Sequence, residues 1–355
     1  MIEILESILP YIKGLWTLPW ILLGFIVTLL LSRFVDENKL DKIMKKIGLI
    51  LLYFLVPLLL FKIFLGVDFH ENEIIFTGLC FVVLSLMYVI AYLFAIYKID
   101  RLKMKDEEKK HFLKTVLTNQ GRSSAFVGGA LLAIYPWRTP AAIYMSIGAI
   151  FLFAIIPYIL SHLHKKNTEK SESYSKVNAL PWYLRLFPWY LLIFAFTAII
   201  LHALANITPG SLGYSNGIIF EFFTSLTIPA ALYYVGSGIH LRDLKKGELK
   251  KLFGFEKETS ESHWAWVRDV FFLTVVITPI IIVLILSPML FLNIIPNGWF
   301  SVIIINSILP ITSTNMLLVP YGIDKKTTAH SVTWTTIVCV PIVVLLIYIF
   351  SMYLM

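Results

Sequence analysis

Charged residues are scarce in this chain of 355 residues, since Asp, Glu, Lys and Arg make up 15% of it and hydrophobic residues make up 58%. Soluble globular proteins carry about 25% charged residues, so this composition is typical of an integral membrane protein. Long polar stretches are also missing, because the longest polar loops run to about 25 residues, well short of a domain. The sequence therefore predicts no separate soluble domain.

Cysteine is nearly absent, with only Cys80 and Cys339, and both lie in apolar segments. This excludes a framework of disulfides. Acidic residues are missing from the middle of the apolar segments, because Glu221 falls at an outer end, Asp269 at an inner start and Asp324 in a loop. A proton relay through carboxylates is therefore not expected.

The signatures of a membrane-embedded enzyme are missing as well. The apolar segments contain no paired aspartates, no His/Glu metal set and no activated Ser or Cys in a known motif. We therefore expect no enzyme activity, no catalytic residue, no metal site and no cofactor. Sodium remains possible as a coupling ion, since Ser, Thr and Asn side chains and backbone carbonyls could bind it.

Apolar segments of about 20 residues, enough to cross a bilayer, recur along the whole chain. We predict ten membrane spans, at about 16–33, 44–64, 74–97, 112–133, 140–162, 184–202, 218–239, 267–292, 299–321 and 328–354.

The positive charge is distributed by loop. Almost all of the 30 Lys and Arg residues fall in alternate loops, and the exceptions are Lys13, Lys62, Arg138 and Arg122. By the positive-inside rule the rich loops are cytoplasmic, which places both termini outside a multi-pass protein of the cell membrane. The net charge of +8 is then explained by topology. Anionic membrane lipids are the expected partner of this charge, and nucleic acid is not.

The ten predicted spans divide into two halves, residues 1–163 and 184–355, joined by a cytoplasmic linker at 164–183. Five spans in each half give the halves opposite orientations. The second span of each half contains a proline, Pro57 and Pro229. The fourth span of each half has a polar, helix-breaking interruption, which is the pattern of inverted-repeat transporters. The predicted fold is therefore all-α, with two inverted five-helix repeats and with broken helices 4 and 9 that cross.

These two interruptions supply the candidate binding residues. Pro and Gly weaken a membrane helix, and Ser, Thr and Asn side chains can satisfy the backbone groups that a break frees. The N-terminal ends of half-helices that start at the breaks would suit an anion. The predicted substrate-binding residues are Asn119, Gly121, Arg122, Ser123 and Ser124 in the first half and Pro310, Thr312, Ser313, Thr314 and Asn315 in the second.

Arg122 is the most specific of these residues. It lies about ten residues into its predicted span, roughly 15 Å along a helix, and a guanidinium there can bind a carboxylate bidentately. The alternatives are that Arg122 extends toward the cytoplasmic surface or caps the carbonyls of a broken helix. Asn119 could bind a carboxylate or only freed backbone, and Asn306 is interpreted as a packing amide.

Three motifs together resemble the auxin efflux carrier family, which includes PIN-type auxin exporters and bacterial malonate-type permeases. They are the run from Pro229 through Gly236 and Gly238, the Asn119-x-Gly121 run followed by Gly128 and Gly129, and the stretch from Pro310 through Tyr321-Gly322 to Pro341. Arg122 and the paired serines depart from the commonest form of the family's motif. The short linker between the halves differs from the long central loop of the PIN branch.

The resemblance implies a scaffold of spans 1, 2, 6 and 7 and a transport domain of spans 3–5 and 8–10. It also implies a substrate site where spans 4 and 9 cross, alternating access of the elevator type and a homodimer formed through the scaffold. The family handles small organic anions and amphipathic carboxylates. The bile-acid/sodium symporter family shares this architecture.

The function expected from the sequence is therefore secondary transport, with export of small organic carboxylates. A monovalent anion leaving a cell held at about 100 mV negative inside gains about 2.3 kcal/mol, so export needs no coupling ion. The alternatives are a sodium-coupled organic anion symporter of the bile-acid type, and a sensor or channel that binds the ligand without carrying it.

Overall fold

The computed structural model describes residues 2–12, 19–32, 34–35, 37–67, 70–123, 131–168, 182–237, 263–312, 315, 318 and 321–353. Over these residues the chain is helical and forms no strand. Seven helices in this part of the chain are long and apolar enough to cross a membrane. The composition-based prediction of an all-α, multi-pass membrane protein is confirmed at this level.

Apart from α1, which precedes the first predicted segment, the helices follow the predicted apolar segments in order. They are α1 (Ile2–Ile8), α2 (Trp20–Leu31), α3 (Glu37–Ile50), α4 (Val56–Leu65), α5 (Glu71–Leu102), α6 (Asp106–Thr118), α8 (Arg138–Ile150), α9 (Ile156–Thr168), α10 (Trp182–Ala205), α11 (Tyr214–Ser237), α13 (His263–Phe272), α14 (Thr278–Phe291), α15 (Asn297–Ser307) and α16 (Lys325–Tyr353).

Three helices within predicted spans are too short to cross a bilayer and do not continue into another described helix. α2 has 12 residues, α6 has 13 and α15 has 11. At 1.5 Å of rise per residue they are roughly 16 to 20 Å long, against about 30 Å of hydrocarbon. α6 and α15 are the first parts of the fourth and ninth predicted spans, the two for which the sequence predicts a break.

Three long helices each contain a five-residue π-turn two residues before a proline. The π-turns are η3 (Leu51–Leu55) before Pro57, η6 (Phe151–Ile155) before Pro157 and η9 (Leu273–Ile277) before Pro279. In η9 the N–H of Thr278 donates to the carbonyl of Leu273. The next bond of this kind would need an N–H from Pro279, which has none, so the carbonyl of Thr274 is left without that donor.

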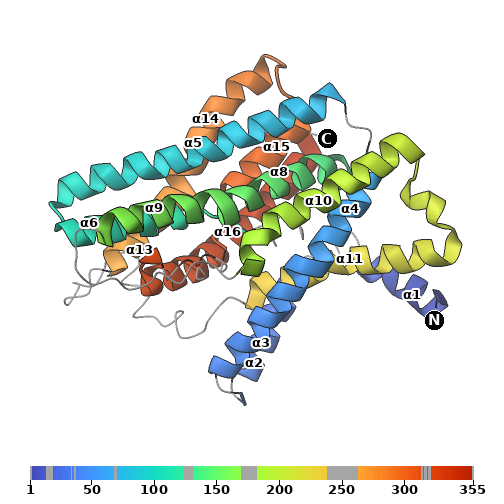
Figure 1. Ribbon diagram of the computed structural model, residues 1–355, viewed down its shortest axis with the longest axis horizontal. Coiled ribbons are helices and arrows are strands. Elements are labelled where there is room, and N and C mark those ends of the chain that lie inside the picture. Colours follow the sequence, from blue (N-terminus) through green and yellow to red (C-terminus); the bar gives the residue numbers. More distant parts are fainter. Residues whose placement is uncertain are drawn as a thin grey trace.

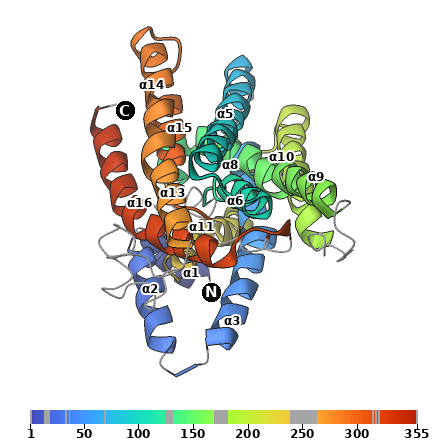
Figure 2. The same ribbon diagram turned by 90° about the vertical axis from the view of Figure 1, so that its left-hand side faces the viewer.

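The helices form two groups (Figure 1). α2, α3, α4 and α11 lie on one side, and α5, α6, α8, α9 and α13 to α16 run beside one another on the other, with α10 along the boundary. Figure 2 shows the same division end-on, with α2 and α3 below α5, α6 and α14.

Glycine brings α2 and α11 into contact. A Cβ on Gly236 would lie 1.9 Å from the carbonyl oxygen of Ile21, and one on Gly24 would lie 2.1 Å from that of Tyr233. Neither position could hold a larger residue unless the backbones moved apart, as is usual for closely packed membrane helices.

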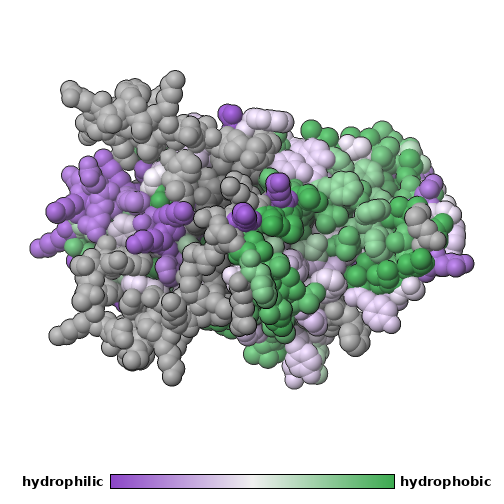
Figure 3. Space-filling model, turned by 90° about the horizontal axis from the view of Figure 1, so that it is seen from below, coloured by the Kyte–Doolittle hydropathy of each residue, from purple (hydrophilic) through white to green (hydrophobic). Residues whose placement is uncertain are grey.

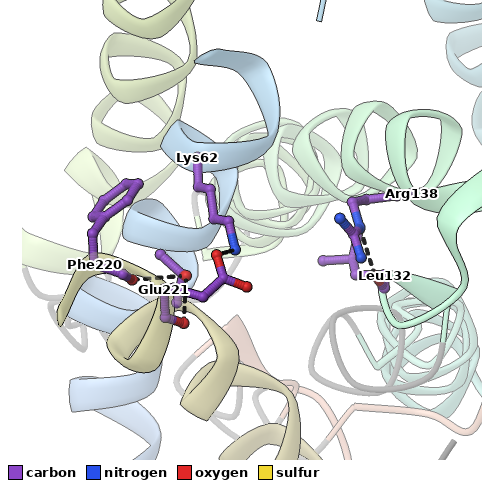
Figure 4. A network of polar contacts seen from close by, with 6 residues as sticks. Lys62, Leu132, Arg138, Phe220 and Glu221 are labelled. Carbon is purple, nitrogen blue, oxygen red and sulfur yellow. Dashed lines mark hydrogen bonds and ion pairs between the residues drawn. The ribbon is translucent and has the colours of Figure 1, made fainter. Parts of the chain in front are cut away.

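Ion pairs link helices within each group. Lys62 of α4 pairs with Glu221 of α11 (Figure 4), and Lys98 of α5 pairs with Asp269 of α13. Glu221 and Asp269, the two acidic residues at the ends of apolar segments, thus form ion pairs with lysines and link neighbouring helices. Figure 4 also shows Arg138 donating from Nε to the carbonyl of Leu132, at 3.1 Å.

The surface has a broad apolar area and a hydrophilic end. On the face shown in Figure 3, apolar side chains cover a broad area, and hydrophilic ones gather at the left end, where α5 meets α6 in Figure 1. The exposed charged residues at that junction are Arg101, Lys103, Lys105, Asp106 and Glu107. An apolar belt with a charged end is the surface expected of a protein that crosses a bilayer.

Candidate functional site

The two interrupted segments lie against each other. After α6 ends at Thr118 and α15 ends at Ser307, the chain becomes extended, and Arg122 pairs with Ile311 in an isolated antiparallel bridge. The N–H of Ser123 donates to the carbonyl of Pro310 at 2.9 Å, and the N–H of Thr312 donates to the carbonyl of Gly121 at 3.0 Å. Each segment therefore satisfies backbone groups that the other leaves without a helical partner.

Side-chain hydrogen bonds also join both interrupted segments to α16. Asn119 donates from Nδ2 to the carbonyl of Thr115 at 2.8 Å and to Oγ1 of Thr328 at 3.2 Å. Thr335, also on α16, accepts from the N–H of Ile311 at 3.1 Å. The hydroxyl-rich start of α16 thus takes over hydrogen bonds that a regular helix would have made internally.

Gly121 allows the close approach at the centre of the crossing. A Cβ at this position would lie 2.6 Å from Oδ1 of Asn315 and 2.7 Å from Cδ1 of Leu152. The Nδ2 atom of Asn315 in turn donates to the carbonyl of Gly121 at 3.4 Å. Any larger residue would displace the side chains of Asn315 and Leu152.

Arg122 is 8% exposed and holds its guanidinium among neutral groups. Its Nη2 atom donates to Oε1 of Gln120 at 3.3 Å and to the carbonyl of Thr274 at 3.4 Å. That carbonyl is the one that Pro279 leaves free in η9. Nε and Nη1 of Arg122 have no partner among the described residues, and no described carboxylate lies within ion-pair distance.

A small cavity of about 30 Å³ lies beside Arg122. It has room for about two waters, or for a small polar group of a ligand. Its polar lining consists of Gln120, Arg122, Asn306, Tyr88 and Tyr144, and the rest of the wall is apolar or glycine, from Leu84, Gly121, Met145, Gly148, Ala149, Phe151 and Leu152.

Two side-chain amides that line the cavity each have one atom without a hydrogen-bond partner among the described residues. Gln120 and Asn306 are 2% and 0% exposed, and Nε2 of Gln120 and Oδ1 of Asn306 have no partner among the described residues. Asn306 donates from Nδ2 to the carbonyl of Val302 at 2.7 Å, so its interpretation as a packing amide accounts for its nitrogen only. The signal available in the sequence was an amide within an apolar segment, four residues before Pro310.

The structure brings most of the predicted site residues together. Asn119, Gly121, Arg122, Ser123, Pro310, Thr312 and Asn315 all take part in the crossing, and all are buried. Ser124, Ser313 and Thr314 lie outside the described residues. Gln120, Asn306, Tyr88 and Tyr144 line the cavity and were not among the predicted binding residues.

The half-helix ends described at the crossing are C-terminal. α6 and α15 both run toward the crossing and end there, at Thr118 and Ser307, and the C-terminal end of a helix carries partial negative charge. These ends favour a cation such as the guanidinium of Arg122. The positive N-terminal ends that the sequence predicts beyond each break fall in segments that the structure describes only in part.

Comparison with known proteins does not identify the family. No protein-family model matches the chain, and a search of curated proteins gives no match. The resemblance to auxin efflux carriers therefore stays a prediction from the sequence motifs.

Proposed function

We propose that this chain is a secondary carrier of small organic carboxylates, with its binding site at the crossing of the interrupted segments. In this proposal ten membrane segments form two inverted halves, and α6 and α15 are the first parts of the broken fourth and ninth segments. Alternating access is of the elevator type, as the resemblance to auxin efflux carriers implies. The group of α2, α3, α4, α10 and α11 serves as the scaffold and as the surface of a homodimer within the lipid of the cell membrane.

The observation that carries this proposal is the buried charge of Arg122. Burying a cation without an anion costs several kcal/mol, and neither Nε nor Nη1 of this guanidinium has a partner among the described residues. An anion in the adjoining cavity supplies the missing charge. A carboxylate suits the site because it accepts hydrogen bonds and matches the geometry of a guanidinium.

The hydrogen bonds of Arg122 define how a carboxylate would be held. Both two-pronged edges of a guanidinium include Nη2, and this atom is engaged at 3.3 and 3.4 Å with Gln120 and Thr274. These distances are long for N–H···O bonds, so either bond can be exchanged at little cost. We therefore expect a first contact at Nε or Nη1 and a bidentate pair once one of the bonds from Nη2 is given up.

Sodium-coupled transport, of the bile-acid type, is the second candidate. Oδ1 of Asn119 and Oδ1 of Asn315 are buried acceptors without a partner among the described residues, and neutral oxygens of this kind bind hard cations. In the first candidate, export is driven by the membrane potential alone. Dependence on external sodium separates the two.

The test is counterflow in proteoliposomes with radiolabelled malonate, succinate, indole-3-acetate and taurocholate, each with and without sodium. Arg122→Gln keeps the size and polarity of the side chain and removes the charge. Because a hydrogen bond to a charged group contributes about 1.5 to 3 kcal/mol, we expect uptake of the transported acid to fall at least about tenfold.

The matched control is Arg138→Gln. Arg138 is a half-buried arginine that donates to the carbonyl of Leu132 and does not line the cavity, so its loss should leave uptake nearly unchanged. Equal uptake by wild type and Arg122→Gln would show that the anion site is elsewhere. Saturable binding of an acid without counterflow would indicate a sensor.

A further inference from the structure

The cavity beside Arg122 offers both hydrogen-bond donors and a hydrogen-bond acceptor. The unpartnered donor atoms of residues that line it are Nε and Nη1 of Arg122 and Nε2 of Gln120, and the unpartnered acceptor atom is Oδ1 of Asn306. All are buried and have no partner among the described residues. A buried polar atom that stays unpaired costs about 1 to 3 kcal/mol. The ligand that fits best therefore pairs with the donors and with the acceptor.

The orientation of the two amides follows from their fixed partners. Nδ2 of Asn306 donates to the carbonyl of Val302 at 2.7 Å, and only the amide nitrogen can do this, so Oδ1 is the free atom. Gln120 accepts from Nη2 of Arg122 at 3.3 Å. Because a guanidinium can only donate, this atom of Gln120 is Oε1, which leaves Nε2 as the free donor.

The size of the cavity limits how far apart the complementary groups of the ligand can be. At about 30 Å³ the cavity holds a group the size of about two waters. A carboxylate that reaches Arg122 therefore brings only its nearest substituent to Asn306. That substituent has to donate a hydrogen bond, since the free atom of Asn306 is an oxygen.

A hydroxyl meets this requirement better than an ammonium. A second positive charge beside the buried guanidinium of Arg122 would be repelled in a medium of low dielectric constant, whereas a neutral hydroxyl would not.

We propose that the site prefers 2-hydroxycarboxylates to the parent acids, with Asn306 as the residue that recognises the hydroxyl. This inference rests on the proposed function, because it assumes that the carboxylate binds at Arg122. The hydroxyl donates to Oδ1 of Asn306 while the carboxylate accepts from Arg122 and from Nε2 of Gln120.

Matched pairs of acids test the preference. Competition against counterflow is measured for lactate against propionate, glycolate against acetate and malate against succinate. We expect each hydroxy acid to compete about tenfold more strongly than its parent, which corresponds to about 1.4 kcal/mol. Equal competition within all three pairs overturns the proposal and is the result expected if a bound water, and not the ligand, satisfies Asn306.

The variant Asn306→Leu tests whether Asn306 causes the preference for hydroxy acids. This variant removes the acceptor and keeps a side chain of similar size, so we expect the ratio within each pair to fall to about one with the parent acid unaffected. Ser301→Ala is the control. It removes another buried polar group of α15 that has no partner among the described residues and does not line the cavity, so the ratio should persist.

The outcomes separate this inference from the proposed function. If Asn306→Leu weakened the competition of all acids in equal proportion, Asn306 would be a structural residue and would have no role in recognition. Transport of parent and hydroxy acids alike would remove the inference and leave the proposed function intact. If wild type neither binds nor transports any acid, the proposed function fails and this inference fails with it.

Discussion

A guanidinium inside an apolar protein needs negative potential around it, and the crossing supplies this from backbone dipoles. Arg122 contacts the carbonyl of Thr274, and α6 and α15 direct their negative ends toward the crossing. Lys114 is a second buried cation on α6, and its Nζ donates to the carbonyl of Tyr321 at 3.1 Å. Carbonyl oxygens thus stabilise both cations in part, and in the proposed function an anionic ligand supplies the full negative charge beside Arg122.

At the residue scale, Gly121→Ala should disrupt the crossing. The added methyl would lie 2.6 Å from Oδ1 of Asn315 and 2.7 Å from a methyl of Leu152, so both side chains would have to shift and Asn315 would lose its bond to the carbonyl of Gly121. We expect a lower temperature of unfolding in detergent, a loss of about 1 to 3 kcal/mol, and loss of uptake. Gly78→Ala is the control, since its Cβ would meet nothing within 4 Å and alanine favours a helix. Equal unfolding temperatures for the two variants would contradict the packing described for Gly121.

At the scale of elements, the π-turn before Pro279 has a consequence for the binding site. Pro279→Ala would restore an N–H that can donate to the carbonyl of Thr274, in competition with Nη2 of Arg122. Arg122 would then lose one of the two groups that orient it. Because Nη2 could then reach the carboxylate without giving up that bond, we expect the KM for the transported acid to fall by up to about threefold, with little change in the amount of folded protein.

Pro57→Ala provides the matched comparison. It makes the same change after the π-turn η3, in α4, which contributes no residue to the cavity. Its KM should equal that of wild type. A similar change in both variants would mean that the effect comes from helix geometry in general and not from Arg122.

The sequence allowed the positions of the two breaks to be predicted, but not their hydrogen-bond partners. Polar and helix-breaking residues at 119–124 and 310–315 are local signals, and α6 and α15 end just before them. The contacts of Arg122 with Thr274 and of Ile311 with Thr335 depend on how distant helices pack. No periodicity or motif contains that information.

The prolines show the same limit. Pro57 and Pro229 were interpreted as equivalent residues of two repeats, yet Pro57 follows a π-turn and Pro229 lies inside the continuous helix α11. Both helices lose one backbone donor at proline. Whether the chain responds with a π-turn depends on the neighbouring helices, so the two sequences alone could not distinguish the outcomes.

At the scale of the whole molecule, the contacts within one group of helices differ from the contacts between the two groups. Within one group, α2 and α11 meet backbone to backbone at Gly24 and Gly236. Between the groups, the contact of η6 with α10 is made by side chains, such as the rings of Phe153 and Phe187 at 5.2 Å. Apolar side-chain contacts of this kind can be exchanged without breaking hydrogen bonds. The boundary along α10 is therefore where the proposed elevator movement would take place.

The number of crossings can be decided by labelling cysteines from outside intact cells. Glu3, Lys105, Ser215 and Lys326 are exposed, and each is replaced by cysteine in turn and treated with a membrane-impermeant maleimide. The native Cys80 and Cys339 are buried and free, so they should add little background. Ten crossings with external termini place positions 3 and 215 outside and positions 105 and 326 inside, where labelling requires permeabilised cells.

A chain crossing only with the seven long helices would give a different pattern. With α2, α6 and α15 not counted as parts of crossings, an even number of spans separates each of the other three positions from position 3, so all four would lie on one side. Uniform labelling would thus refute the ten-segment arrangement, while the alternating pattern would support it. The distinction bears on the binding site, because Arg122 lies at mid-membrane depth only if α6 is the first part of a segment that crosses. The same experiment therefore tests whether the buried charge of Arg122 lies within the membrane.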